Sequence, residues 1–498
     1  MTVCVLFRWV LRPFLTKRPP GTAALIFPTV QFALFFAVVL PLSWALMPRQ
    51  GLWRPFILAA SYYFYAAADW HYVFLLAGST VVNQLAATVI TRQASEKVRR
   101  TALITAIALD LGTLGVFKYL DFFSDSVSGS LGLSLGLLHL VLPVGVSFYT
   151  FQAISYVVDV HRGRTPLAKP LDYAIYASFF PHLVAGPIVR ASEFVPQLSG
   201  PRDPNRIPAG RAFGLIAGGL VKKMVVADMI GTKLVEPVFG TPQAHNGTET
   251  LMAVYGYAVQ IYCDFSAYTD MAIGLALLLG FRFPDNFDRP YTARSLQDFW
   301  RRWHMTLSRW LRDYLYIPLG GNRRGSLKTY RNLMLTMLLG GLWHGAAWTF
   351  VVWGGIHGVG LAVERAWPSI ADAVRFPASI PAHIPQPVKT TAARIITFHV
   401  VCLAWVFFRA PDLGTAFAVL GRLFAGGPST GVVTPTIVFL IAAALAVQWL
   451  PRGTGARLQE AFVTLPVYAQ GVSLGVLLLV VAAVSGGQGV APFIYFRF

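Results

Sequence analysis

The chain has 498 residues, of which 55% are hydrophobic and 13% charged. Its mean hydropathy of +0.57 arises from apolar runs that continue along the whole chain. Several soluble domains would instead show apolar cores separated by polar linkers. A formal net charge of +19 would suit a nucleic-acid-binding protein, but no polar domain with a basic face and no nucleic-acid-binding motif is present. The composition therefore argues against nucleic acid as a partner and predicts an integral membrane protein in a lipid bilayer.

Apolar windows recur from one end of the chain to the other, and about 20 helical residues cross the roughly 30 Å of bilayer hydrocarbon. Because a helix satisfies its own backbone hydrogen bonds in lipid, the windows predict an all-α bundle of about 11–13 transmembrane helices. Residues 1–23 are expected to form an appendage, and residues 24–498 a single membrane domain. The expected spans are 24–47, 52–68, 72–91, 101–123, 140–160, 213–230, 251–281, 333–343, 348–363, 395–408, 434–450 and 472–484.

One apolar segment, residues 171–189, has basic residues on both sides and is therefore expected to enter and leave the membrane by the same face. Pro181, Gly186 and Pro187 would interrupt a straight helix in this segment. Irregular backbone at membrane depth is tolerated where protein covers it or where it lines a watery cavity. The segment therefore predicts a re-entrant hairpin beside a cavity.

Basic residues gather in alternate loops, at 49–54, 92–100, 162–169 and 282–331. By the positive-inside rule these loops are cytoplasmic. Basic residues within the first 18 positions favour the opposite orientation, but four consistent loops outweigh one tail.

The segment "FWRRWHMTLSRWLRDYLYIPLGG" (299–321) concentrates arginines around a histidine and tryptophans. At helical spacing its apolar residues form one stripe, which predicts an amphipathic helix along the membrane interface. His304 lies on this stripe and should face protein or lipid. Taken alone, it is better interpreted as a hydrogen-bonded histidine in a packed interface. The stripe consists of Trp300, Trp303, His304, Leu307, Trp310, Leu311 and Tyr314.

A second histidine, His344, ends an apolar run that starts near Asn332, which places it roughly 18 Å into the membrane at 1.5 Å per helical residue. An ionisable group at that depth indicates a functional site. Glycines next to it, such as Gly341 and Gly345, allow close helix packing or the approach of a substrate. The alternative is a neutral histidine packed in the core. His357 lies on a different helical face and is expected to pack.

A polar stripe of Tyr257, Gln260, Asp264 and Tyr268 follows helical spacing within an otherwise apolar window. Acidic groups are expensive in lipid, so the stripe should face the bundle interior. Two roles for Asp264 remain open. It could act in the site by orienting a histidine or holding a substrate hydroxyl, or it could make an internal polar contact that only fixes the helices.

The loop "PLGGNRRG" (318–325) lacks the lysine and hydroxyl residue of a phosphate-binding P-loop. Arg323 and Arg324 are candidates to receive phosphates or an acidic carrier, although cytoplasmic topology alone would explain them. No metal site is expected, because the histidines have neither metal-ligand spacing nor a cluster of carboxylates beside them.

Dispersed stretches of the sequence, in order, resemble the membrane-bound O-acyltransferase family, and within it the bacterial alginate O-acetyltransferase branch. The resemblance implies helices around a central tunnel, with His344 at the position of the principal catalytic histidine and His304 at that of the second. Trp303 and Trp343, beside these histidines, join Gln260, Asp264, Tyr268, Arg323 and Arg324 as candidate substrate or donor contacts. The matching stretches are "LPVGVSFYTFQAISYVVDV" (142–160), "FFPHLVAGPI" (179–188), "QIYCDFSAYTDMAIGLALLLGF" (260–281), "FWRRWHMTLSRWLRDYLYIPLGGNRRG" (299–325), "LLGGLWHGAAWTFVVWGGIHG" (338–358), "LAWVFFRA" (403–410) and "PFIYFRF" (492–498).

The resemblance also implies an activity. A multi-pass protein of the bacterial inner membrane would move an acetyl group from a cytoplasmic thioester to hydroxyls of an extracytoplasmic polysaccharide such as alginate, with His344 as general base. The donor would be acetyl-CoA or an acyl carrier protein, acting as a co-substrate with no bound cofactor. A periplasmic acetyltransferase is a second possible acceptor. The alternatives are D-alanyl transfer toward teichoic acid and a non-enzymatic polysaccharide channel or scaffold.

Overall fold

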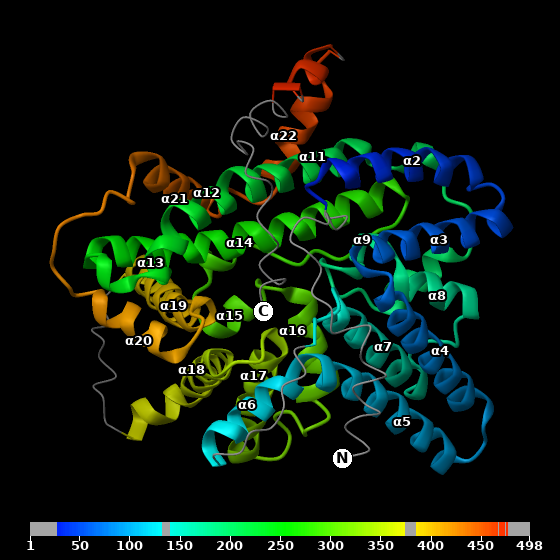
Figure 1. The fold of residues 1–498 in the computed structure, drawn as a ribbon, viewed down its shortest axis with the longest axis horizontal. Helices are drawn as coiled ribbons and strands as arrows, with labels where there is room; N and C mark the ends of the chain where they lie inside the picture. Colours follow the sequence, from blue (N-terminus) through cyan, green and yellow to red (C-terminus); the bar gives the residue numbers. More distant parts are fainter. Residues whose placement is uncertain (1–26, 132–139, 374–384, 467, 474, 477–498) are drawn as a thin grey trace. The chain divides into compact units, whose positions relative to one another are not determined.

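The computed structural model describes residues 27–131, 140–373, 385–466, 468–473 and 475–476, and all regular secondary structure in these ranges is helical (Figure 1). The chain forms two compact units. The first comprises the described residues up to 212 together with 271–284, and the second comprises 213–270 and the described residues from 285 onward. The predicted appendage, residues 1–23, lies outside the described ranges.

In the first unit, α4 packs along both α5 and α7. Its interior is rich in aromatic side chains such as Tyr65, Tyr72 and Tyr149, which form one buried cluster with Leu76 and Leu183. The helices of this unit are α2 (Val30–Leu46), α3 (Gln50–Asp69), α4 (His71–Arg92), α5 (Glu96–Leu114), the π-helical η2 (Gly115–Tyr119), α6 (Leu120–Leu131), α7 (Val146–His161), α8 (Pro170–Ser178), α9 (Phe180–Leu183) and α10 (Ala191–Phe194).

The expected interruption in segment 171–189 is confirmed. Helix α8 ends at Ser178, and the short α9, which contains Pro181, ends at Leu183. Gly186 then adopts a φ of +143°, and a Cβ on it would lie 3.1 Å from the Cβ of Ala272. The return of this segment to the same membrane face stays a prediction.

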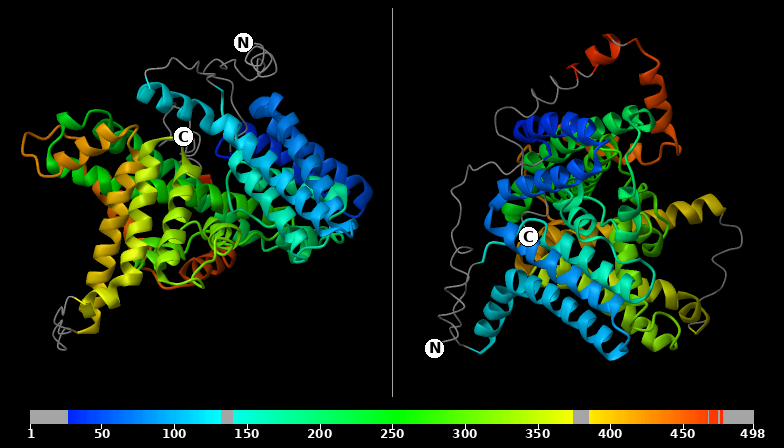
Figure 2. Two further views of the ribbon diagram at one scale, coloured as in Figure 1. Left: turned by 90° about the horizontal axis from the view of Figure 1, so that it is seen from below. Right: turned by 90° about the vertical axis from the view of Figure 1, so that its right-hand side faces the viewer.

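His304 and His344 both belong to the second unit, where α17 (Ser326–His344) and α18 (Trp348–Ala373) pack side by side as a hairpin (Figure 2). Helices α11 (Ala209–Leu220) and α14 (Gly247–Leu278) contain the points at which the chain passes between units. The remaining helices are the π-helical η5 (Val221–Ala227) and η6 (Gly231–Val235), α12 (Asp228–Ile230), α13 (Glu236–Gly240), α15 (Leu296–Trp300), α16 (Met305–Leu311), the π-helical η9 (Arg312–Tyr316), α17 (Ser326–His344), α18 (Trp348–Ala373), α19 (Gln386–Arg409), α20 (Leu413–Arg422), α21 (Pro435–Val447) and α22 (Thr454–Val463).

Three helical stretches in the described ranges are long and apolar enough to cross a membrane, namely His71–Arg92, Glu96–Val127 and Gln386–Arg409. Large apolar side chains such as Phe74, Val81 and Leu85 are exposed along the first of them, as expected for contact with lipid. The membrane character predicted from composition is therefore supported. The larger number of spans stays a prediction, and most of the last expected span, 472–484, lies outside the described residues.

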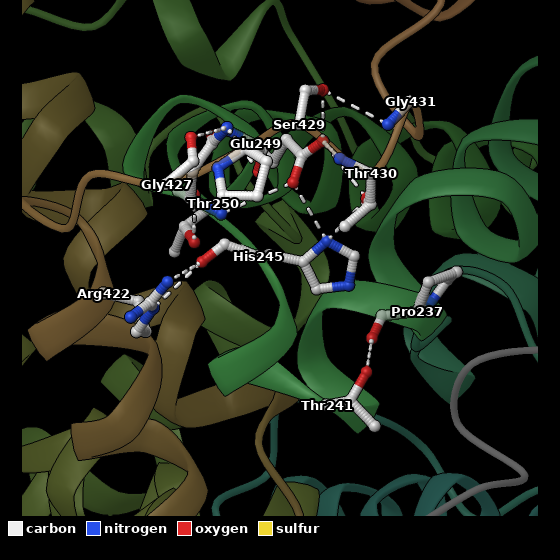
Figure 3. Close-up of polar contacts among 12 residues, drawn as sticks. Pro237, Thr241, His245, Glu249, Thr250, Arg422, Gly427, Ser429, Thr430 and Gly431 are labelled. Atoms are coloured by element: carbon white, nitrogen blue, oxygen red, sulfur yellow. Dashed lines mark hydrogen bonds and ion pairs between the residues drawn. The ribbon is translucent and has the colours of Figure 1, made fainter.

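The start of α14 is held by a buried carboxylate (Figure 3). Glu249 accepts hydrogen bonds from Ser429 Oγ at 2.7 Å, from the Thr430 backbone N–H at 2.7 Å and from Thr430 Oγ1 at 3.1 Å. His245 Nδ1 lies 3.1 Å from the same carboxylate, and Arg422 Nε donates to the His245 carbonyl at 2.9 Å. These bonds attach the segment between α20 and α21 to the beginning of α14.

Candidate active site

His304 lies at a break between two helices, so the prediction of one continuous amphipathic helix through residues 300–314 is wrong. Helix α15 ends at Trp300, and α16 begins at Met305. Between them His304 adopts a left-handed φ of +42° and acts as the N-cap of α16, where its Nδ1 accepts a hydrogen bond from the Leu307 N–H at 3.4 Å.

Hydrogen bonds to Asn286 explain the break. The Asn286 carbonyl accepts from Met305 N–H at 2.9 Å, and its side-chain oxygen accepts from Thr306 N–H at 3.0 Å and Thr306 Oγ1 at 2.9 Å. Asn286 is almost fully buried. A non-glycine residue with left-handed backbone costs on the order of 1–3 kcal/mol and persists where surrounding contacts enforce it, often at active sites. Tertiary hydrogen bonds thus override the helical periodicity at His304.

The protonation state of His304 follows from these contacts. Because Nδ1 accepts a hydrogen bond, the ring proton sits on Nε2, which is buried and has no hydrogen-bond partner in the described ranges. Burial lowers the pKa of His304 to about 3, so the ring is neutral at physiological pH. Its ring lies edge-on to Phe265 of α14 at 4.6 Å.

His344 is the last residue of α17 and is 3% exposed. Aromatic rings surround its imidazole, with centroids at 4.9 Å for Trp343, 5.0 Å for Trp353 and 5.2 Å for Phe408. Gly341 permits this arrangement, because a Cβ on it would overlap the backbone carbonyl of Phe350 on α18. Close helix packing is therefore the observed use of this glycine.

Trp343 contacts both histidines, with its ring centroid 6.2 Å from that of His304 and 4.9 Å from that of His344. Trp303 is also buried, and its ring packs at 5.0 Å against Trp405, which in turn stacks on Trp353 at 5.9 Å. The structure thus brings His304, His344, Trp303 and Trp343 into one aromatic enclosure. Sequence reasoning did not single out Trp353, which completes it.

Buried nitrogens without a hydrogen-bond partner in the described part of the chain include His304 Nε2, Trp353 Nε1 and the Nε2 of His357, whose ring contacts Trp353. Buried N–H groups are nearly always hydrogen-bonded in folded proteins. The enclosure therefore offers donors to an oxygen acceptor such as a carbonyl or hydroxyl. This chemistry suits acyl transfer between a thioester and an alcohol.

The predicted polar stripe of α14 faces the interior, with Tyr257, Asp264 and Tyr268 all buried. Asp264 Oδ1 lies 2.7 Å from Lys223 Nζ, and the same ammonium lies 2.8 Å from Asp228 Oδ1. The internal contact is thus the role that the structure supports for Asp264. Sequence reasoning missed Lys223. A lysine within an apolar window needs a buried partner, and this pattern could have pointed to it.

Gln260 and Tyr268 of the same stripe were predicted to contact substrate. Gln260 packs against Gly231, where a Cβ would overlap its side chain. Tyr268 lies one helical turn beyond Asp264 and is 1% exposed. Their role in binding substrate stays a prediction.

A basic cavity of about 960 Å³ opens next to the break at His304. Arg301 and Arg365 line it, and their side chains have neither an ion-pair nor a hydrogen-bond partner within the described residues. Asn322 of the loop 318–325 also lines it, whereas Arg323 and Arg324, the candidate donor contacts of this loop, are exposed next to it. Other polar and aromatic lining residues include Trp300, Arg309, Arg312 and Glu364.

Comparisons with known proteins identify the family of this chain. A sequence model of the membrane-bound O-acyltransferase family matches residues 167–386, which include both histidines. A probable alginate O-acetylase of Pseudomonas putida is 39% identical over 473 residues, covering 89% of this chain and 94% of the relative. A peptidoglycan O-acetyltransferase of Helicobacter pylori is 38% identical over 392 residues, covering 73% of this chain and 72% of the relative.

A more distant relative transfers a different acyl group. A teichoic acid D-alanyltransferase of Bacillus subtilis is 28% identical over 284 residues, covering 54% of this chain and 69% of the relative. The two relatives named as acetylating enzymes are therefore more similar to this chain than the D-alanyltransferase is, both in identity and in the share of the chain that is covered. The apolar helices, the match to the family model and the likeness to the alginate relative along most of its length show that the chain is a membrane protein and belongs to the membrane-bound O-acyltransferase family.

Proposed function

We propose that this protein is a polysaccharide O-acetyltransferase of the bacterial cytoplasmic membrane, which moves acetyl groups from a cytoplasmic thioester to hydroxyls of an extracytoplasmic polysaccharide. The observation that carries the proposal is that two buried histidines, His304 and His344, both contact the ring of Trp343. The names of the acetylating relatives support acetyl as the transferred group and a polysaccharide as the acceptor. The lower identity of the D-alanyltransferase makes D-alanyl transfer the weaker candidate.

In the proposed reaction, the neutral imidazole of His344 takes the proton of a sugar hydroxyl as its oxygen attacks the thioester carbonyl carbon. The Nε2–H of His304 stabilises the oxyanion of the tetrahedral intermediate. Collapse of the intermediate breaks the carbon–sulfur bond, and the leaving thiolate takes the proton from His344. General-base help of this kind typically accelerates a reaction by about 10²- to 10⁴-fold. A thioester is already reactive, so the reaction needs no metal ion.

The basic cavity supports a phosphate-bearing donor. Acetyl-CoA and the phosphopantetheine arm of an acyl carrier protein both carry phosphate groups, and arginine binds phosphate well through its planar set of donors. Arg301 and Arg365 are the cavity arginines that lack a carboxylate partner among the described residues. Arg323 and Arg324 on the neighbouring loop would add attraction for the donor. The positive-inside rule assigns this basic region to the cytoplasmic side.

The proposed reaction also sets requirements on the architecture. A charged donor and a polysaccharide do not cross hydrocarbon readily, so their reactive ends must meet within the protein. About 11–13 spans around a central tunnel, with segment 171–189 as a re-entrant hairpin beside it, would provide such a meeting point. A periplasmic acetyltransferase is an alternative acceptor that would carry the acetyl group to the polysaccharide.

The proposal is tested by complementation in a Pseudomonas putida strain that lacks its own alginate O-acetylase. We expect the wild-type chain to restore acetyl esters on secreted alginate, measured by mass spectrometry, and His344→Gln to restore none although it reaches the membrane in equal amount. His161→Gln, a substitution of the same kind at the end of α7, should behave as wild type. Full acetylation with His344→Gln would instead support a channel or scaffold.

A further inference from the structure

His357 is a buried histidine to which the reaction above assigns no role. It lies on α18, is 0% exposed, and is enclosed by aromatic rings. Phe299 stacks on it with centroids 6.0 Å apart and planes at 8°, while Trp300 and Trp353 lie edge-on at 5.2 and 4.9 Å. Packing alone would be served as well by a phenylalanine or leucine.

A hydrogen bond distinguishes His357 from an apolar residue of similar size. The Trp300 indole Nε1–H donates to His357 Nδ1 at 3.3 Å. Because an indole nitrogen can only donate, Nδ1 must be the unprotonated nitrogen of the ring. The proton of the neutral ring therefore sits on Nε2, which has no hydrogen-bond partner within the described ranges.

The two tryptophans that contact His357 differ in their other contacts. Trp300 is half-buried and lines the basic cavity. Trp353 lies 4.9 Å from His357 and 5.0 Å from His344, measured between ring centroids. Ring contacts thus run from the cavity wall through Trp300, His357 and Trp353 to the proposed general base.

We propose that His357 is a positioning residue for acyl transfer: by accepting the Trp300 hydrogen bond it fixes its own ring, and through Trp353 it sets the orientation of the His344 imidazole. This inference rests on the proposed function. His357 does not share an aromatic contact with His344, so it acts through Trp353 rather than on the reacting atoms. A general base works only in a narrow geometry, and a misplacement of about 1 Å can cost on the order of 10²-fold in rate.

The test compares purified His357→Leu and His357→Asn with wild type in acetyl transfer from acetyl-CoA to alginate oligosaccharides. Leucine fills the space but cannot accept a hydrogen bond, whereas the Asn Oδ1 lies close to the position of Nδ1. We expect His357→Leu to lower kcat about 10- to 100-fold with donor KM within about threefold of wild type, and His357→Asn to recover most of that loss. Trp300→Phe removes the donor of the same bond and should lower kcat similarly, with no further loss in the Trp300→Phe/His357→Leu double variant.

The outcomes separate this inference from the proposed function. A normal kcat for both His357→Leu and Trp300→Phe overturns the positioning role while His344→Gln remains inactive. Equal loss of activity in His357→Asn and His357→Leu also overturns it, because the imidazole would then be needed for more than this bond. If His357→Leu does not fold, as judged by size-exclusion chromatography, Trp300→Phe decides the question. Activity in His344→Gln would overturn the proposed function itself.

Discussion

The backbone N–H of Leu307 donates to His304 Nδ1 at 3.4 Å, which makes the proposed catalytic ring the cap of helix α16. The cap fixes the tautomer, and it directs the ring's only N–H, on Nε2, away from the helix. One side chain therefore has a structural function at Nδ1 and a proposed catalytic function at Nε2. The two functions can be separated by mutation.

His304→Asn should keep the first function and lose the second. Asparagine is a good N-cap and tolerates left-handed backbone better than most residues, but it places no donor at the Nε2 position. We expect kcat to fall about 10²- to 10³-fold, as for loss of one oxyanion donor, with an apparent Tm close to wild type. His304→Ala should lose the same activity and also the cap, at about 1 kcal/mol. An active His304→Asn enzyme would contradict the oxyanion role.

Arg301→Gln and Arg365→Gln should each raise the KM for acetyl-CoA and leave kcat nearly unchanged. Each removes a charged hydrogen bond to phosphate worth about 1.5–3 kcal/mol, which corresponds to roughly a tenfold or larger increase. Raising the ionic strength should increase the wild-type KM more than that of either variant. The control is Arg206→Gln, since the Arg206 side chain is 87% exposed and lies outside the cavity. An unchanged donor KM in both variants would exclude the cavity as the donor site.

Lys223→Met should destabilise the protein strongly, because it leaves the buried carboxylate of Asp264, and the partly exposed carboxylate of Asp228, without their lysine. Breaking a buried ion pair from one side costs about 3–5 kcal/mol. The added change Asp264→Asn should recover part of the loss, measured as thermal stability in detergent. Lys233→Met, at an exposed position in the same region, is the matched control. A purely substrate-binding Asp264 would instead show wild-type stability in Lys223→Met.

Glu249 should make the stability of the protein depend on acid pH. Burial by itself would raise the pKa of Glu249, but the hydrogen bonds from Ser429, Thr430 and His245 lower it from 4.5 to about 2. A carboxylate with a lowered pKa stabilises the folded state fully above its ordinary value, and this contribution is lost as the pH falls toward the folded-state value. Wild type should therefore exceed Glu249→Gln in thermal stability at pH 7.

The advantage of wild type over Glu249→Gln should shrink between pH 4.5 and about 2, the interval between the two pKa values. The control Glu460→Gln removes an exposed carboxylate of α22 and should show little difference from wild type at any pH. A stability difference for Glu249→Gln that stays constant down to pH 2 would contradict the role of the ionised carboxylate.

Much of the site could be predicted from the sequence, because composition and local spacing carry the relevant physics. Long apolar windows predict helices in lipid, and His344 does end the helix in which it was predicted, at the point where Gly345 follows. The burial of the α14 polar stripe was also predicted, because an acidic side chain such as Asp264 must avoid lipid. The family resemblance added the pairing of His344 with His304.

Only the tertiary structure decided how these residues meet. The helix expected around His304 breaks because Asn286 binds the backbone of Met305 and Thr306, and no local pattern records a bond to a residue about 20 positions earlier in the chain. The ion pair of Lys223 with Asp264 also joins two different helices and has no local pattern. Trp353 packs against His344 only because α17 and α18 fold back on each other. Local periodicity determines which face of a helix is apolar, whereas the partner of a buried polar group depends on which helices lie side by side.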